Sequence, residues 1–513
     1  MKPWLDRVTG RVTMYRLVLL SLIALGVIAL ALSVATLIAP SLNLLGYGPL
    51  ALLASAAVAL AFTTGANWAI ARALGVEAHT ESSFITALLV FFVMGPKLDL
   101  VGLGSIALAG VIASVSKYVL AVRGRHVFNP AAVGVFVVTL ITFAGASGFS
   151  FAAWWAGTPY LLLPVAIAAF LILYLTQRLA LGAVFLGVAA VSIVVRYALT
   201  GSAPGDALQY LLLSSPAVFF AGFMLSEPPT LPPRRWQQLA EAALVALLFT
   251  VPFSLGLLTS TPQVALLVGN LLAFLVGQRR GIRLAYLGKK QLGPTTWELA
   301  FAPARPVRFL PGQYMELTIP HRRADFRGSR RYFSISSAPG DDRITFALTV
   351  PSKSSSFKQA LLDLEPGATV VGTGVGGDFA LPRDASEPLL LVAGGIGITP
   401  FASQLAHATE RGDRRDVVLV YATSTPGELP YRELLERSGA RVVLFGPEPA
   451  ALPEGWWYGG GGRVTGERLA VSVPDAAARR AYVSGPPALV NDLRRALRAQ
   501  GVRRIHSDYF SGY

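Results

Sequence analysis

An uncharged apolar run extends from Leu17 to Pro40. It is longer than the roughly 20 residues that a helix needs to cross a bilayer. It also lacks the cleavage site of a signal peptide, so we interpret it as a membrane span. The composition agrees, because a chain of 513 residues that is 53% hydrophobic and only 14% charged is too apolar for a soluble protein. We therefore predict a membrane protein.

Ten apolar windows before residue 280 predict ten membrane segments, at 16–39, 48–71, 83–96, 98–120, 130–146, 159–176, 179–198, 208–225, 237–257 and 262–278. With the N-terminus inside, the cytoplasmic loops receive Arg72, Arg123, Arg125, Arg178, Arg234 and Arg235. The opposite side receives only Lys97 and Arg196. Because cytoplasmic loops are enriched in Lys and Arg, we expect a multi-pass protein of the cell membrane with both termini in the cytoplasm. The same bias explains the net charge of +15 without a nucleic-acid partner.

The third window is unusually short. "SSFITALLVFFVMGP" ends at Pro96, and "SSPAVFFAGFMLSEP" in the eighth window ends at Pro228, an offset of 228 − 96 = 132 residues. Proline-interrupted segments at matching places in two halves are typical of inverted repeats whose broken helices meet near the membrane midplane. Five segments per half, an odd number, would invert one half relative to the other. The alternative is two unrelated re-entrant or tilted helices.

The composition changes after Gly281, where charges become frequent and short β-type segments such as "TWELAFA" appear between turn signals. We expect a soluble cytoplasmic part from here on. The chain has no cysteine, which excludes disulfides, iron–sulfur clusters and thiolate metal sites, and no metal site is predicted.

Three motifs in this part predict phosphate binding. "LLLVAGGIGITPFASQLAH" is a buried strand, a glycine turn and a helix start, and such a turn lets the backbone approach a pyrophosphate. In "RRYFSISSAP", strand alternation puts Arg331 and Phe333 on one face, where a guanidinium could clamp a phosphate while the ring packs on a flat ligand. "KSSSFKQAL" offers a second phosphate site at a helix start, and "YVSGPPALVNDL" ends a strand at Gly485-Pro486.

These elements, in this order, resemble the ferredoxin–NADP reductase superfamily, through "RRYFS", "GTGVGGDF", "GGIGITP" and "SGPP". The resemblance implies an NAD(P)H-dependent flavin oxidoreductase with an antiparallel FAD-binding β-barrel at 284–384 and an α/β NAD(P)-binding domain at 388–513. The FAD-binding residues would be Arg331, Tyr332, Phe333, Ser334, Ser355 and Ser356. The residues for NAD(P)H would be Gly394, Gly395, Gly397, Thr399, Gly485 and Pro486. The residues at the reacting rings would be Ser334, Ser484, Asp508, Tyr509 and Phe510.

In detail, the resemblance implies that Arg331 binds the FAD pyrophosphate, that Phe333 stacks on the flavin and that Ser334 lies near its N5. One departure is Ser484, because many relatives have cysteine there. We expect an altered rate or nicotinamide position rather than loss of activity. Ser424 lacks a neighbouring arginine that could bind a 2′-phosphate, which slightly favours NADH over NADPH.

The membrane half needs a redox group of its own if it does more than anchor the reductase. Haem is disfavoured, because only His79 and His126 precede residue 280 and both fall in loops, where we expect partnered histidines. "SKYVLAVRGRHVFNPAAVG", with the two short segments, resembles the NqrB/RnfD-like flavin-carrying membrane subunits of the sodium-pumping NADH:quinone reductase and the Rnf complex. Over residues 15–280 this implies ten spans in two inverted halves and a membrane flavin.

That family attaches FMN to the threonine of an Ala-Thr-Pro motif. Here Thr158 precedes Pro159, but Gly157 replaces the alanine and the polar residues before it are missing. Noncovalent flavin, or a plain helix N-cap at Thr158, remains possible. Asn129 and Asn270 are further candidate flavin contacts. The spans offer no convincing acidic ion site, since Glu227 and Asp99 lie at segment ends.

We thus expect a transmembrane domain at 1–280 followed by the reductase. Cytoplasmic NAD(P)H would reduce FAD, and electrons would pass through a membrane flavin to an extracytoplasmic flavoprotein or a quinone. The alternatives are a redox-driven ion pump or transporter, and a quinone reductase. A single cytoplasmic FAD cannot span a hydrocarbon core that is ~30 Å thick.

Overall fold

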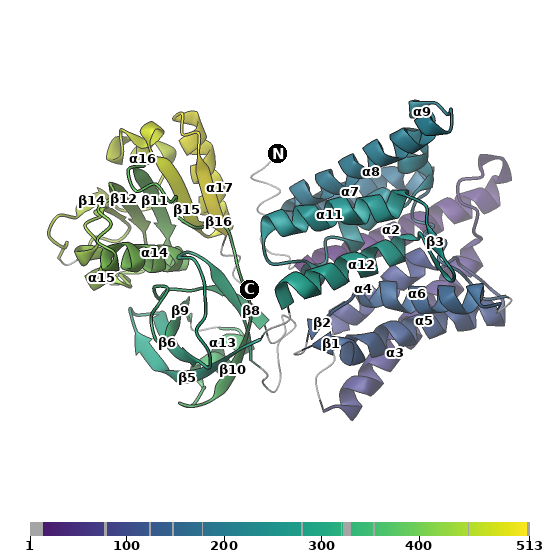
Figure 1. Cartoon of the computed structure of the whole chain (residues 1–513), viewed down its shortest axis with the longest axis horizontal. Helices are drawn as coiled ribbons and strands as arrows, with labels where there is room; N and C mark the ends of the chain where they lie inside the picture. Colours follow the sequence, from purple (N-terminus) through teal and green to yellow (C-terminus); the bar gives the residue numbers. More distant parts are fainter. Residues whose placement is uncertain are drawn as a thin grey trace. The chain divides into compact units, whose positions relative to one another are not determined.

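The computed structural model describes residues 14–75, 80–122, 125–145, 148–176, 178–278, 281–319, 321, 330–351, 354–449 and 451–509. The chain divides between residues 279 and 280 into two compact units, which we call the helical unit and the reductase unit. Figure 1 shows the first in purple to teal and the second in green to yellow.

All ten apolar windows are helical, as expected from their composition. The helices are α2 (Met14–Ile38), α3 (Pro49–Ala73), α4 (Thr80–Val93), α5 (Leu100–Val119), α6 (Pro130–Phe143), α7 (Pro159–Leu175), α8 (Leu179–Leu199), α9 (Pro204–Gln209), α10 (Ala217–Phe219), α11 (Arg235–Thr250) and α12 (Pro262–Ala273). Within the eighth window, π-helical turns follow α9 at Tyr210–Ser214 and α10 at Phe220–Met224.

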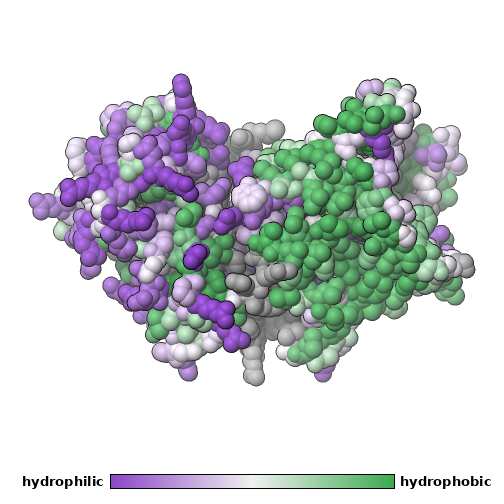
Figure 2. All heavy atoms as spheres, in the orientation of Figure 1, coloured by the Kyte–Doolittle hydropathy of each residue, from purple (hydrophilic) through white to green (hydrophobic). Residues whose placement is uncertain are grey.

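The described residues do not confirm the expected ten membrane spans. Four helices, α2, α3, α5 and α8, are long and apolar enough to cross a membrane, or up to five if the pair Pro204–Ser214 and Ala217–Met224, bent by 60°, counts as one span. The other apolar helices are shorter, and the 14 residues of α4 rise only about 21 Å. The visible face of the helical unit is covered by apolar residues, and Val27 is 61% exposed (Figure 2). Such a surface suits a lipid environment.

The offset of 132 residues recurs at a second place. α6 begins at Pro130 and α12 at Pro262, and each helix has a polar N-cap, Asn129 or Thr261, whose side chain accepts from a backbone N–H three residues on. A helix start with a side-chain cap and proline at the first position is favourable. The two halves therefore share more than the proline-interrupted segments.

The equivalent helices α6 and α12 run antiparallel. The N–H of Asn129, before α6, donates to Oδ1 of Asn270 in α12 at 2.8 Å. Thr139 and Phe143, near the end of α6, line the same small cavity as Thr261 and Gln263 at the start of α12. The start of α6 thus lies near the later part of α12, and its end near the start of α12.

The reductase unit begins with an antiparallel sheet in the order β8-β7-β10-β5-β6-β9. Its strands are β5 (Ile282–Gln291), β6 (Thr296–Pro303), β7 (Tyr314–Thr318), β8 (Arg330–Ser334), β9 (Ile344–Thr349) and β10 (Thr369–Gly376). An isolated bridge between Ile335 and Phe346 joins the two ends of this order, so the sheet closes into a barrel around a core that includes Phe301. The short helix α13 (Ser356–Leu362) packs its Phe357 into this core.

The second part of the unit is a parallel sheet in the order β14-β13-β12-β11-β15-β16. Its strands are β11 (Leu389–Gly394), β12 (Val417–Ala422), β13 (Arg441–Phe445), β14 (Trp457–Gly460), β15 (Arg480–Gly485) and β16 (Ile505–Tyr509). Residues of β11 alternate between two cores, so α14 (Thr399–Glu410) and α15 (Arg432–Arg437) cover one face while α16 (Gly466–Ser472) and α17 (Pro487–Ala499) cover the other. The expected barrel and α/β domain are both confirmed. The strand order reverses between β11 and β15, where doubly wound sheets bind ligands.

Candidate functional site

The glycine turn after β11 packs against the end of β15. A Cβ on Gly397 would lie 2.4 Å from the carbonyl oxygen of Ser484 and 2.8 Å from Cα of Gly485, so only glycine fits. Gly395 has φ +53°, and nothing lies within 4 Å of its Cβ position. The turn therefore packs tightly against β15 at Gly397, whereas Gly395 has free space around its Cβ position. Thr399 opens α14 at this point, with its hydroxyl donating to Ile396 O at 3.0 Å.

Three strand ends meet beside this turn. In the sheet register Ser484 pairs with Ala393 on one side and with Asp508 on the other. Gly485 lies so close to β11 that its Cβ position is 3.1 Å from Cα of Gly394. Pro486 then leads into α17. The hydroxyl of Ser484 is buried and has no hydrogen-bond partner among the described residues.

Asp508 and Tyr509, two of the residues expected at the reacting rings, differ in their surroundings. Burial raises the pKa of the Asp508 carboxyl to about 6. The hydrogen bond from Tyr509 N lowers this pKa, and the nearby charge of Asp378 raises it slightly. The Tyr509 hydroxyl accepts from Arg494 at 2.5 Å and donates to Asn491 at 3.3 Å, both on α17. Tyr509 is therefore held by α17 through its hydroxyl. Phe510 lies outside the described residues.

On the barrel, β8 presents two of the expected FAD residues to one ring. The guanidinium carbon of Arg331 lies 5.1 Å from the centre of the Phe357 ring, and Phe333 stacks on the same ring at 6.0 Å. Arg331 and Phe333 therefore share a face, as alternation predicts. Tyr332 points the other way and is 53% exposed, while Ser334 is buried.

The expected second phosphate site is next to Phe357. Ser355 caps α13, its hydroxyl accepting from Lys358 N at 3.4 Å, and the Ser356 hydroxyl lies 3.0 Å from Nε2 of His321. The fold thus brings Arg331 and the two serines to one end of α13, although they are distant in sequence.

Sequence reasoning missed the residues that join the barrel to the α/β domain. Ser403 on α14 donates to the Ser337 carbonyl at 2.6 Å, directly behind the glycine turn. Further links run from Tyr431 to Glu298 at 3.1 Å and from Thr295 N to Glu428 at 3.0 Å. No local signal marks these residues, because each bond connects positions far apart in the chain. Together they fix the angle at which the two domains face the site.

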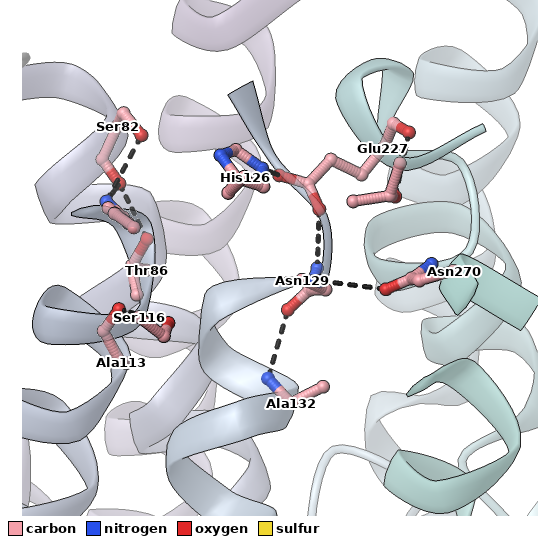
Figure 3. A network of polar contacts seen from close by, with 11 residues as sticks. Ser82, Thr86, Ala113, Ser116, His126, Asn129, Ala132, Glu227 and Asn270 are labelled. Atoms are coloured by element: carbon pink, nitrogen blue, oxygen red, sulfur yellow. Dashed lines mark hydrogen bonds and ion pairs between the residues drawn. The ribbon is translucent and has the colours of Figure 1, made fainter. Parts of the chain in front are cut away.

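The helical unit contains a polar network of its own (Figure 3). Glu227 accepts from Asn129 Nδ2 at 2.9 Å, and its other oxygen lies 3.0 Å from Nε2 of His126. Asn129 also caps α6 and donates its N–H to Asn270. Every polar side-chain atom of Asn129 is therefore used within the protein, which leaves it as a structural connector between the halves rather than a free flavin contact. His126 has a partner, as predicted, while His79 lies outside the described residues.

Thr158 lies beside the break in the bent segment. A Cβ on the preceding Gly157 would be 2.8 Å from Pro216 N and from the backbone of Ser215, the residues at the bend. Thr158 is the N-cap of α7 but makes no capping bond, and its buried hydroxyl has no partner among the described residues. Thr158 therefore takes the N-cap position, as that alternative expected, but its side chain does not cap the helix.

The other short segment ends differently. After α4, Gly95 N donates to Phe151 O at 3.2 Å, Trp154 N donates to Val93 O, and Ser150 Oγ donates to Gly95 O. The freed backbone at this break is therefore satisfied by the protein itself.

Sequence reasoning missed an acidic residue inside one of the apolar windows. Glu241 lies inside α11, is fully buried, and neither carboxylate oxygen has a hydrogen-bond partner among the described residues. The sequence signal was available, because Glu241 is an acidic residue within the apolar window 237–257.

The strand ends fit a nicotinamide dinucleotide. A tight, side-chain-free turn at a helix start offers backbone N–H groups and the positive end of the helix dipole to a pyrophosphate. The partnerless hydroxyl of Ser484 lies beside this turn and can bind a ligand. On the barrel, the guanidinium of Arg331 and the start of α13, where the hydroxyls of Ser355 and Ser356 lie, are both next to Phe357, as the expected second phosphate site requires.

Known proteins carry the same part. Residues 391–495 match the model of the oxidoreductase NAD-binding domain family. The toluate 1,2-dioxygenase electron transfer component of Pseudomonas putida is 30% identical over 236 residues, which cover 45% of this chain and 68% of that protein. The ferredoxin–NAD(+) reductase component of the alkene monooxygenase system of Xanthobacter autotrophicus is also 30% identical, over 43% of this chain and 68% of its own. Among solved structures, the Amycolatopsis cytochrome P450 reductase GcoB is 26% identical and covers 45% of this chain and 70% of its own, with a TM-score of 0.39.

The fold, the site and the sequence relatives define the class of this protein as an NAD(P)H-dependent flavin oxidoreductase. Through its reductase unit the chain belongs to the ferredoxin–NAD(P)+ reductase family, and FAD and NAD(P)H are the cofactors of this unit.

Proposed function

We propose that this chain is a transmembrane electron conduit that oxidises cytoplasmic NAD(P)H and delivers electrons through a flavin of the helical unit. The domains would be 1–280 in the cell membrane, 284–384 for FAD and 388–513 for NAD(P)H. Both termini and the reductase unit would lie in the cytoplasm. The acceptor would be an extracytoplasmic flavoprotein or a quinone of the bilayer.

In the reductase unit, each residue group has a separate role. FAD, when bound, accepts a hydride and releases single electrons. Arg331, with Ser355 and Ser356, would hold its phosphates, Phe333 would stack on the ring system, and Ser334 would lie near its reactive edge. Tyr332 would contact FAD from the exposed face of β8. The turn at Gly394, Gly395, Gly397 and Thr399 would bind the NAD(P)H pyrophosphate. Ser484, Gly485, Pro486, Asp508 and Phe510 would surround the nicotinamide. The bonds of Tyr509 to α17 favour a role in positioning β16.

One observation carries the membrane part of the proposal. The hydroxyl of Thr158 is buried without a partner next to the bend at Ser215-Pro216, and a buried polar group without a partner is costly unless a ligand satisfies it. Covalent or noncovalent FMN at Thr158 would do so. The antiparallel pair α6 and α12 supports inverted halves, because a two-fold axis in the membrane plane reverses equivalent helices.

The test is the flavin content of the purified full chain. We expect more than one flavin per chain, all reducible by NADH or NADPH, and mass spectrometry of the denatured protein shows whether one stays attached. Thr158→Val should then lose the second flavin and keep FAD. Thr261→Val is a matched control, because Thr261 also precedes a proline at a helix start but its hydroxyl accepts from Val264 N. A wild-type chain that contains one FAD and no second flavin would contradict the proposed electron conduit.

The two candidate electron acceptors can be distinguished with the same purified protein. In proteoliposomes with the reductase unit outside, reduction of an impermeant acceptor trapped inside indicates transfer across the bilayer. Reduction of an added quinone alone indicates a quinone reductase.

A further inference from the structure

Glu241 is the least satisfied charged group that we find in the helical unit. It lies on the buried face of α11 together with Ala242 and Val245, six residues after Arg235, or about 9 Å along the helix. Its Oε1 lies 3.1 Å from the Cβ position of Gly269 on α12, so the missing side chain of Gly269 makes the space for the carboxyl.

Among the described residues, no opposite charge pairs with this carboxyl. α11 packs mainly against α8 and α12. α12 contains no titratable residue, and α8 contains only Arg196 and Tyr197, both in its last turn. On α11 itself, Arg235 is the nearest titratable residue and stands at the helix start. An ionised carboxylate buried without a partner costs far more than a neutral acid in the same place.

A metal ion does not fit this position. Na⁺ and other hard cations need several oxygen ligands, whereas the described residues contain no group of three or more His, Cys, Asp and Glu side chains that could hold a metal. Gly269, whose Cβ position lies 3.1 Å from Oε1 of Glu241, contributes no side-chain oxygen. A proton needs only the carboxyl oxygen itself.

The other half of the unit lacks this group. At the repeat offset, Glu241 corresponds to Ala109 on α5 (241 − 109 = 132), and Ala109 is also fully buried. The repeat architecture therefore does not require a carboxyl at this position.

We propose that Glu241 is an exchangeable proton-binding site inside the helical unit. The carboxylate takes up one proton to form the neutral acid and releases it again, with no electron transferred in this step. The assignment holds whether or not the helical unit carries electrons. If it does, a proton held here can neutralise a negative charge gained nearby, and that consequence alone rests on the proposed function.

Infrared difference spectroscopy of the full chain in detergent tests the site directly. A protonated carboxylic acid has a carbonyl band separate from that of a carboxylate, and exchange into D2O shifts it. We expect such a shifting band in the wild type and in Glu227→Gln, but not in Glu241→Gln. Glu227 is the matched control, because it has the partners Asn129 and His126 and is partly exposed. A band unchanged in Glu241→Gln overturns the proposal, and so does a band that fails to shift.

A second measurement needs no substitution, in case Glu241→Gln does not fold. A hydrophobic carbodiimide adds to protonated carboxyl groups in apolar surroundings, and peptide mass spectrometry locates the adduct. We expect at least tenfold more adduct at Glu241 than at Glu227 in the same wild-type sample. Equal labelling overturns the proposal. Protection of Glu241 by added Na⁺ at constant pH would reassign the site to a metal ion.

Discussion

The substitution Gly397→Ala tests whether the turn after β11 is the dinucleotide site. The added Cβ would lie 2.4 Å from Ser484 O, and ordinary contact begins near 3.4 Å. The obstructing atoms belong to the backbone of β15, which is held by β11 on one side and β16 on the other. Backbone atoms held in this way cannot move aside as a flexible side chain could, so the turn itself must shift by about 1 Å.

The cost follows from that displacement. A misplacement of about 1 Å in a binding element can lower a rate by about 10²-fold, which corresponds to about 2.7 kcal/mol in transition-state stabilisation. We therefore expect kcat/KM for NADH to fall about 100-fold. FAD content should not change, because the expected FAD residues Arg331 and Phe333 lie on β8 of the barrel and not in this turn.

The assay is NADH-dependent reduction of ferricyanide by the purified full chain, with flavin absorbance as the measure of FAD content. Gly461→Ala is the control in the same domain, because nothing lies within 3.8 Å of its Cβ position and its φ is ordinary. If Gly397→Ala keeps the kcat/KM of the wild type at equal FAD content and melting temperature, the turn does not bind the dinucleotide.

Three further predictions concern single side chains. Ser484→Ala should raise the free energy of unfolding in the absence of NADH by about 1 kcal/mol, because the Ser484 hydroxyl has no hydrogen-bond partner among the described residues; thermal melting checks this. If the hydroxyl binds the ligand, the same substitution should raise KM for NADH, which steady-state kinetics check. Burial raises the pKa of Asp508 to about 6 from 3.8, so the stability that it contributes is complete below pH 3.8 and is lost as pH rises through 6, by at most about 3 kcal/mol. Asp508→Asn should therefore melt progressively higher than the wild type from pH 4 to 7, and parallel melting curves would contradict this. Gly222→Ala should destabilise the helical unit by about 1–3 kcal/mol, because its Cβ would lie 2.4 Å from that of Ala169, whereas Gly187→Ala, in open space, should not.

Sequence patterns predicted the parts of this protein that depend on local signals. Helical windows follow from apolar composition, and the strand, turn and helix around Gly394 follow from glycine spacing. The number of spans could not be predicted in this way, because a short apolar helix such as α4 reads as a span until its neighbours are known. α4 is instead largely buried by other helices of the unit.

Partners of polar side chains were the least predictable feature, because they come from distant segments. Asn129 looked like a flavin contact, yet Glu227 and Asn270 occupy it. Tyr509 looked like a ring contact, yet α17 holds its hydroxyl. Thr158 is the opposite case, since the local pattern allowed a helix cap and the structure leaves the hydroxyl partnerless. Hydrogen bonding can be assigned only when every donor and acceptor nearby is known.

The two halves of the helical unit carry different polar side chains at positions related by the offset of 132 residues. His126 and Glu227 correspond by the offset of 132 to Leu258 and Gly95, which cannot form the same pair. In an inverted repeat, equivalent positions lie toward opposite faces of the membrane, so the polar pair marks one face and has no counterpart on the other. In the proposed conduit, the pair of His126 and Glu227 would therefore place polar side chains near one end of the electron path and not near the other. If the helical unit carries electrons as proposed, His126→Ala should slow transfer from NADH to an acceptor across the bilayer without altering FAD content. An unchanged transfer rate would contradict a role for this pair.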